Sequence, residues 1–276
     1  MRPSQIRCRM ELTLLTINTW KCDGDYYNRR AVLERELKKN EAQVILCQEC
    51  FRSMDGSVDT LEQLSQGLGM PAWYVPCRRK ERMLADRWVD SFSGLGILTS
   101  LPVTDHAVID LPSDGVDGGR KAQLLTIGLA SGQTLLVANI HLTHLPDDKL
   151  RRRQLQAIVE IMSSSEASFR IIGGDWNAET HSPILNEMMD TAPAADCYVL
   201  GQGAAPRYSL LSFFRRGAPV CVDHFFALPS EAAINGSSKP SIYPSFIRAG
   251  IVLDQPDAGS GLYPSDHFGI CVTLTY

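Results

Sequence analysis

The sequence IIGGDWNAE, residues 171–179, joins an aliphatic run to two glycines and then places Asp175 and Asn177 on either side of a tryptophan. A buried strand that ends at the two glycines would present both polar side chains at one strand end, because alternate residues of an extended chain share a face. Such strand ends often carry chemistry in α/β proteins. The same residues also suit a tight turn or a helix cap. The other strand ends of the chain must therefore decide between a functional and a structural interpretation.

The chain has the composition of an ordinary globular protein. Of its 276 residues, 44% are hydrophobic and 21% are charged, and the formal net charge is -4. No apolar stretch approaches the ~20 residues of a membrane span, and the polar start has no signal-peptide core, so we expect a cytoplasmic protein. The acidic balance gives no general attraction to nucleic acid. The eight cysteines are dispersed, which favours free thiols over a disulfide framework.

Strand-like apolar runs recur along the whole chain and alternate with amphipathic segments. The runs span residues 12–18, 42–49, 93–100, 123–129, 134–142, 169–175, 220–228 and 267–276. Helices are expected at 28–40, 60–68, 147–162 and 182–190, and in the third of them Leu155, Ile158, Val159 and Met162 mark one buried face. Because no repeat or linker interrupts this pattern, we predict one domain over residues 1–276, in which residues 1–11 form a flexible N-terminal extension.

Short polar side chains stand where several of these runs end. One polar strand end is usually structural, but several that are all carboxylate, amide or imidazole are hard to explain as separate caps. Oxygen ligands of this kind suit Mg²⁺ or Mn²⁺, and an Asp and a His beside such an ion are the parts that phosphoester hydrolysis requires. The residues are Asn18, Glu49, His141, Asp175 with Asn177, Asp223, and Asp266 with His267.

The motifs NTW, QE, NIH, GDWN, VDH and SDH, in this order, resemble the endonuclease/exonuclease/phosphatase superfamily. That family includes deoxyribonuclease-I-like nucleases, neutral sphingomyelinases and inositol phosphatases. The resemblance covers the chain from about residue 12 to 275. It implies an α/β fold in which two packed sheets are flanked by helices in four α/β/β/α layers, and a metal-dependent phosphoesterase that uses Mg²⁺ or Mn²⁺.

The resemblance also implies a metal site and a position for the attacking water. Glu49 resembles the principal metal carboxylate, and Asn18 and Asp266 resemble its helpers. Asp175 resembles the residue that orients or deprotonates the attacking water, while Asn177 resembles the residue that holds the phosphate and the developing charge.

Three further residues resemble those that contact the phosphate or support the contact. His267 resembles the histidine that bonds the scissile phosphate, and Asp223 the carboxylate that fixes its tautomer and charge. His141 matches a second phosphate-binding position, and whether it donates the leaving-group proton stays open.

Basic and aromatic residues outside the motifs are candidates for substrate contacts. The loops expected at 76–92 and 201–217 carry arginines and aromatic residues, among them Trp88, Tyr208, Phe213 and Phe214. Arg151 leans toward the buried face of its helix, where it could brace the site or meet phosphate. Ordinary loop packing and solvated surface are the competing interpretations.

Two other features are interpreted as structural. Cys47 and Cys50 form a C-x-x-C, but in an extended strand their sulfurs would point to opposite faces, and a second such pair is missing. His224 would diverge from Asp223 for the same reason. His144 is either a loop residue or a substrate contact.

Together these observations predict a hydrolase in which a metal- and Asp-activated water attacks a phosphoester in line. The acidic chain with only short basic clusters favours a small or single-ended phosphoester over a duplex that is held through many phosphates. An endonuclease or exonuclease acting on DNA or RNA is the alternative. A catalytically inactive binding module of the same fold is a more remote one. We expect a monomer without a membrane span.

Overall fold

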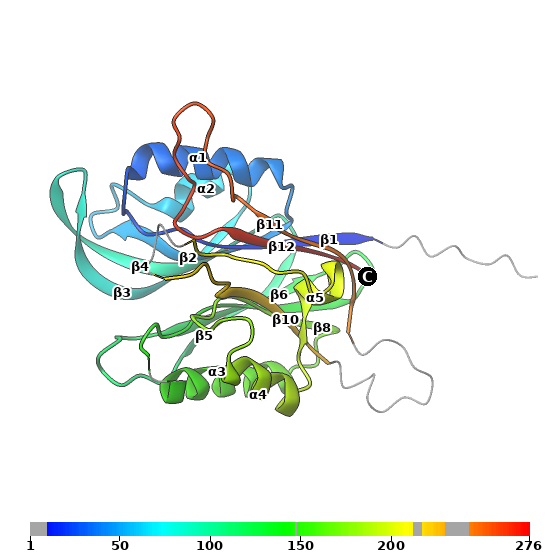
Figure 1. Cartoon of the computed structure of the whole chain (residues 1–276). Helices are drawn as coiled ribbons and strands as arrows, with labels where there is room; N and C mark the ends of the chain where they lie inside the picture. The colour runs from blue at the N-terminus through cyan, green and yellow to red at the C-terminus, as the bar shows by residue number, and fades with distance from the viewer. Residues whose placement is uncertain (1–9, 147, 212–216, 230–242) are drawn as a thin grey trace, which may run out of the picture.

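Two six-stranded sheets form the centre of the molecule in a computed structural model that describes residues 10–146, 148–211, 217–229 and 243–276 (Figure 1). The first sheet has the strand order β11-β12-β1-β2-β4-β3, and the second has the order β5-β6-β7-β8-β10-β9. The pairs β1 with β2 and β7 with β8 are parallel. The other pairs are antiparallel, so each sheet is mixed.

The strand bounds show which parts of the chain each sheet uses. The first sheet contains β1 (Glu11–Asn18), β2 (Val44–Ser53), β3 (Ala72–Leu84), β4 (Arg87–Thr99), β11 (Ser245–Val252) and β12 (Gly269–Thr275). The second contains β5 (Val103–Asp110), β6 (Lys121–Gly128), β7 (Thr134–His141), β8 (Phe169–Asp175), β9 (Ala195–Asp196) and β10 (Asp223–Leu228).

Helices cover the outer faces of the two sheets, which gives the predicted four layers. The first sheet carries α1 (Tyr26–Lys39) and α2 (Thr60–Leu68), and the second carries α3 (Asp148–Ser163) and α4 (Pro183–Thr191) (Figure 1). The short α5 (Cys197–Gln202) packs beside β11. Among the described residues, no helix combines the length and the apolar character that a bilayer crossing needs.

The principal core lies between the two sheets. Leu14 and Leu46 of the first sheet pack in one cluster with Val137, Ile171 and Phe225 of the second. Each of these side chains is fully buried, and burial of one such group stabilises the fold by about 1.5–3 kcal/mol. This central layer holds the strand ends of both sheets in a fixed relation.

The predicted helices and apolar strands are confirmed, with boundaries that differ by a few residues. On α3, Leu155, Ile158 and Met162 are buried and Val159 is partly buried against the second sheet. Residue 11 is not part of an extension, because Glu11 is the first residue of β1 and pairs with Thr275. Residues 1–9 lie outside the described residues.

The interpretation of residues 76–92 as a loop is wrong. Most of this segment belongs to β3 and β4, which form a hairpin with Met83 opposite Trp88. The exposed and charged residues of this hairpin leave no apolar alternation to indicate a strand. The sequence does not indicate the edge strands β5 and β11 for the same reason, since exposed side chains interrupt their apolar pattern.

The register of the second sheet brings three predicted site residues side by side. His141 of β7 pairs with Asp175 of β8, and Asp175 pairs with Asp223 of β10. The three strands therefore end at the same level, and the polar ends of these apolar runs form one row. The sequence IIGGDWNAE supplies the central member of that row.

The two glycines of this sequence permit close packing on both sides of β8. A Cβ at position 173 would lie 2.3 Å from the Phe225 ring, and one at position 174 would lie 2.1 Å from the Ile140 carbonyl oxygen. Gly174 also has φ +141°, a conformation that L residues rarely adopt. Trp176 is fully buried in the apolar cluster that α3 and α4 form with the second sheet, whereas Asp175 and Asn177 on either side of it border the cavity at the strand ends.

The Gly174→Ala variant is expected to lose roughly 2–4 kcal/mol of unfolding free energy, because the new Cβ meets backbone and the φ becomes strained. Chemical denaturation would measure this loss. Gly250→Ala in β11 is the matched control, since a Cβ there meets no atom within 4 Å. Equal stability of the two variants would contradict the close approach of β7 and β8.

Candidate active site

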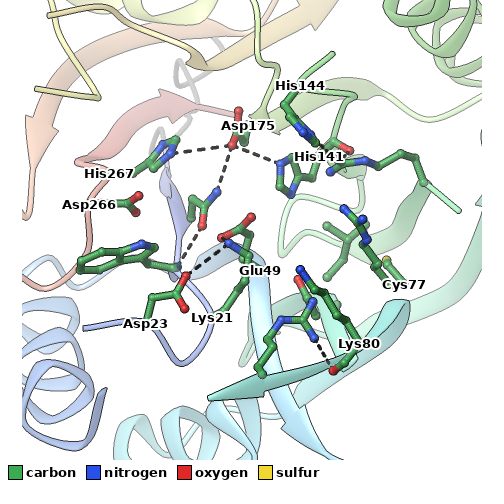
Figure 2. A pocket seen from close by; sticks show the side chains of 18 of the residues that line it. Lys21, Asp23, Glu49, Cys77, Lys80, His141, His144, Asp175, Asp266 and His267 are labelled. Carbon is green, nitrogen blue, oxygen red and sulfur yellow. Dashed lines mark hydrogen bonds and ion pairs between the residues drawn. The ribbon is translucent and has the colours of Figure 1, made fainter. Parts of the chain in front are cut away.

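Asp175 is the centre of the polar cluster at the strand ends (Figure 2). Its Oδ2 accepts a hydrogen bond from Asn18 Nδ2 at 3.0 Å and lies 3.4 Å from His141 Nε2. Its Oδ1 accepts from the backbone N–H of Asn177 at 3.0 Å. Burial raises the pKa of Asp175, and the charge of Asp223 raises it further. The carboxylate is therefore held in place and is a better proton acceptor than an exposed aspartate.

His267 and Asp223 form a buried pair beside Asp175. The His267 Nδ1 lies 2.8 Å from Asp223 Oδ2, and its Nε2 lies 4.0 Å from Asp175 Oδ2. Burial opposes the charged imidazole, but Asp223, Asp175 and Asp266 outweigh it and raise the pKa of His267 to about 10. The ring is thus an imidazolium at neutral pH, with Nδ1–H donated to Asp223 and Nε2–H directed into the site.

His141, on the other side of Asp175, has the opposite electrostatic character. Burial lowers its pKa well below the usual range, and the charges of Arg120, Lys21 and His267 add to this effect. One histidine is therefore neutral and the other charged within the same site. Environments that separate pKa values in this way are typical of sites that move protons.

A β-bulge in β2 directs Glu49 into the site. Cys47 pairs with Gly96 and Cys50 with Gly94, so Gln48 and Glu49 together occupy the space opposite one residue. Glu49 has φ 56°, an unusual conformation for a non-glycine residue. The expectation that the two cysteine sulfurs point to opposite faces is wrong, because the bulge puts both in the same buried cluster.

A buried hydrogen-bond network joins the bulge to the second sheet. Asn139 of β7 donates through Nδ2 to the carbonyl oxygens of Cys47 at 3.0 Å and Gly96 at 2.9 Å. Gln48 Nε2 donates to Asn139 Oδ1 at 2.7 Å. These bonds fix the strand end that carries Glu49 relative to the strand end that carries His141.

Lys21 is a site residue that the motifs do not predict. Its Nζ lies 2.8 Å from Glu49 Oε2 and 3.6 Å from Asp23 Oδ2. Burial opposes the charge of Lys21, but Glu49 outweighs it and raises the lysine pKa. The residue follows Asn18 by three positions in a turn where Lys21 itself has φ 46°. The only sequence signal for Lys21 is its place in the turn that directly follows the polar strand end at Asn18.

The carboxylates near this turn fit a divalent cation. Asn18, Glu49 and Asp266 border the same cavity. Burial raises the pKa of Asp266, and the negative charge of Glu49 raises it further although His267 opposes this. Two carboxylates that repel each other beside an amide oxygen suit Mg²⁺ or Mn²⁺.

A second group of possible ligands fits a metal less well. Asp175, Asp223 and His267 each place a potential ligand atom within 4.8 Å of the others. However, the His267 imidazolium already supplies a positive charge between the two carboxylates and uses Nδ1 for Asp223. A protonated nitrogen has no lone pair for a metal, so this group fits a cation less well while His267 carries its proton.

One cavity of about 570 Å³ is bordered by the two histidines, by Asp175 with Asn177, and by Asn18, Lys21, Glu49 and Asp266, while Asp223 is fully buried behind His267. Trp88 and His144 also border it, together with cations from β3 and from the segment before β6. Trp88 is 68% exposed. His144 contacts Arg120 and Asp117 at 3.1 Å each, which favours its interpretation as part of the cavity rim.

Two of the predicted substrate contacts lie elsewhere. Arg151 and Tyr208 border a neighbouring hollow that meets the main cavity at Asn177. The Arg151 guanidinium donates to the carbonyl oxygens of Thr143 and Leu145 and pairs with Asp148, so it braces the segment after β7. Phe213 and Phe214 lie outside the described residues.

His224 has the structural role that its position in β10 predicts. The buried ring contacts the Ala178 carbonyl oxygen through Nε2 at 2.9 Å and Arg207 Nη2 through Nδ1 at 3.1 Å. It does not border the main cavity. The seven cysteines in the described part of the chain are free thiols, as expected.

An α/β sandwich whose strand ends gather carboxylates, amides and histidines in one cavity is the architecture of a phosphoesterase or nuclease. A model of the endonuclease/exonuclease/phosphatase family matches residues 15–267, and the chain therefore belongs to this family. It is accordingly an enzyme of the class of metal-dependent phosphoesterases and nucleases. Among curated proteins, a sequence search found no significant match.

Solved structures share the fold at low sequence identity. A family protein from Leptotrichia buccalis has a TM-score of 0.72 and 14% identity, covering 96% of this chain and 100% of its own. A mannosyl-6-phosphatase from Bacteroides thetaiotaomicron has a TM-score of 0.70 and 18% identity, covering 96% and 100%. TDP2 of D. rerio, in complex with a single strand DNA product, has a TM-score of 0.69 and 16% identity, covering 96% and 98%.

Proposed function

We propose that this enzyme hydrolyses phosphoesters with Mg²⁺ or Mn²⁺ by in-line attack of water. The observation that supports this most directly is the position of Asp175 between the His267 imidazolium and the neutral His141. Asp175 accepts the proton of the attacking water, for which its raised pKa is suited. When bound at Glu49, Asn18 and Asp266, the cation would neutralise charge on the phosphoryl oxygens.

His267 and Asn177 act on the phosphoryl group in this proposal. The Nε2–H of His267 donates to a phosphoryl oxygen, where an imidazolium stabilises the negative charge that develops. Asn177 donates one N–H of its amide to the Leu142 carbonyl oxygen at 3.0 Å, which leaves the second N–H for the phosphate. Asp223 holds the tautomer and charge of His267.

His141 is proposed as a hydrogen-bond donor to the phosphate rather than as an imidazolium acid. Its lowered pKa means that the ring carries no charge at neutral pH. A neutral ring still donates one N–H, but it has no extra proton to give to a leaving group. Solvent water would then protonate the departing oxygen.

A small or single-ended phosphoester is the proposed substrate class. The cavity of about 570 Å³ has the size of a site for a small molecule, and the net charge of -4 disfavours a long contact with duplex phosphates. The structural relatives include a sugar phosphatase and a protein bound to a DNA product, so a nucleic-acid end is the second candidate.

A panel of phosphoesters assayed with Mg²⁺ at low and moderate salt tests this class. We expect turnover of small monoesters or of single-ended substrates, with weak dependence on salt. Efficient nicking of plasmid DNA that falls steeply as salt rises would show that the preference is wrong and that the enzyme is an endonuclease.

The Glu49→Gln variant is expected to need at least about ten-fold more Mg²⁺ for half-maximal activity, because one charged metal ligand becomes a neutral amide. Saturating Mg²⁺ should restore part of kcat, since the amide oxygen can still coordinate. A Mg²⁺ titration of activity measures both effects. Glu34→Gln, on the surface of α1, is the control. An unchanged Mg²⁺ requirement would place the cation elsewhere.

A further inference from the structure

Three cations of β3 form a row along one wall of the cavity. Arg78, Lys80 and Arg82 stand at alternate positions after the bulge that follows Pro76, and all three border the cavity. Alternate residues of a strand share a face. Figure 2 shows that Lys80, at the centre of the row, lies across the cavity from His267.

No carboxylate pairs with this row in the described part of the chain, where no ion pair within 4.0 Å includes Arg78, Lys80 or Arg82. Glu81 also borders the cavity, but it lies between Lys80 and Arg82 in the strand and is therefore not one of the alternate residues that form the row. The contrast is Arg79 on the opposite face, whose Nε lies 3.1 Å from both carboxylate oxygens of Asp90.

Arg82 anchors one end of the row, while Arg78 and Lys80 are exposed. Arg82 is 8% exposed, and its Nη1 donates to Ser91 Oγ at 3.0 Å and to the Lys80 carbonyl oxygen at 3.2 Å. Alternate strand residues are roughly 7 Å apart, which is inside the Debye length of about 8 Å at physiological salt. The three like charges therefore repel one another, and an anion placed among them would relieve that repulsion.

We propose that Arg78 and Lys80, supported by Arg82, bind a second phosphate group of the same substrate molecule. This inference rests on the proposed phosphoester hydrolysis and specifies its substrate class. The first phosphate reacts at Asp175 and His267, while the second is held at the row on the opposite wall. The preferred substrate thus carries two phosphate groups, either as a small bisphosphate or as an end of nucleic acid with its next phosphodiester.

Matched substrates test the second-phosphate site. Fructose bisphosphate is compared with fructose monophosphate, and the dinucleotide pTpT with thymidine monophosphate. In at least one of these pairs we expect the wild-type enzyme to favour the member with two phosphates by at least about ten-fold in kcat/KM, the effect of one charge-assisted hydrogen bond. The pair that shows the preference identifies the source of the second phosphate.

Arg78→Ala and Lys80→Ala should each lower this kcat/KM ratio toward one. Arg79→Ala is the control, because its side chain is ion-paired on the other face of β3, and it should leave the ratio unchanged. A wild-type ratio near one in both pairs would overturn the inference, and so would equal ratios in the wild-type enzyme and the Arg78 and Lys80 variants.

Calorimetric binding of the same ligands to the Asp175→Asn variant separates the two proposals. Binding that is tighter for the ligand with two phosphates and is weakened at least about ten-fold by a further Arg78→Ala change supports the second-phosphate site even without turnover. Equal binding with and without Arg78 would exclude the site. Absence of hydrolysis of every phosphoester would instead count against the proposed function.

Discussion

Asp175→Asn is expected to lower kcat by at least about 10²-fold, because an amide cannot accept the proton of the attacking water. The substitution preserves shape, and the backbone N–H of Asn177 can still donate to the new side-chain oxygen. Steady-state kinetics with the best phosphoester of the panel would measure the loss. The concentration of Mg²⁺ at half-maximal activity should stay within about two-fold, since Glu49 and Asp266 are unchanged.

The stability of the same variant discriminates a catalytic role from a structural one. The folded-state pKa of Asp175 is raised, so the folded protein holds a proton on this group more tightly than the unfolded chain does. The ionised carboxylate therefore destabilises the fold at neutral pH. Asp175→Asn should keep or raise the melting temperature while kcat falls by at least about 10²-fold. Near-normal kcat, or a loss that follows unfolding, would show that the role is misassigned. Asp90→Asn on the exposed hairpin is the control.

The positions of the polar strand ends can be predicted from the sequence, because the apolar runs are long and stop at polar residues. His141, Asp175 and Asp223 each end or begin such a run, and parallel or antiparallel pairing at the same level then brings them together. The pairing itself follows from the buried layer between the sheets, which only one register can fill with apolar side chains. The fold class and the motif positions could therefore be predicted together.

The parts that could not be predicted depend on contacts between distant segments. The bulge at Glu49 is hydrogen-bonded by Asn139 from the other sheet, and no local residue pattern indicates it. Lys21 enters the site through a turn with two residues at positive φ, neither of which is glycine. Arg151 points toward the buried face of its helix, as expected. Its guanidinium, however, donates hydrogen bonds to the nearby carbonyl oxygens of Thr143 and Leu145.

The β3–β4 hairpin shows why substrate contacts are the hardest to predict. Its strands extend beyond the part of the sheet that is covered by apolar packing, so charged residues occupy both faces. Sequence alone cannot say which face meets the cavity. The structure settles this, because Arg78 and Lys80 border the cavity, whereas the Arg79 guanidinium is bound to the Asp90 carboxylate.

His267→Ala is expected to lower kcat by at least about 10²-fold, because it removes the cation that stabilises charge on the phosphoryl oxygen. Asp223→Asn tests the same pair without deleting the ring. In the metal-free wild-type protein, His267 should keep its proton until the pH approaches about 10. Without the Asp223 carboxylate, its pKa should fall, and NMR of the imidazole would report the change.

The wild-type enzyme and Asp223→Asn are also expected to differ in their pH dependence, since the charged form of His267 is the active one. The raised pKa means that the stabilisation from this group is complete below the unfolded value of 6.5 and is lost as the pH rises through about 10. Activity that needs the imidazolium should decline over the same alkaline range, and in Asp223→Asn the decline should begin at a lower pH. If Asp223→Asn lowers the His267 pKa but leaves both kcat and its alkaline limit unchanged, the imidazolium does not stabilise the transition state.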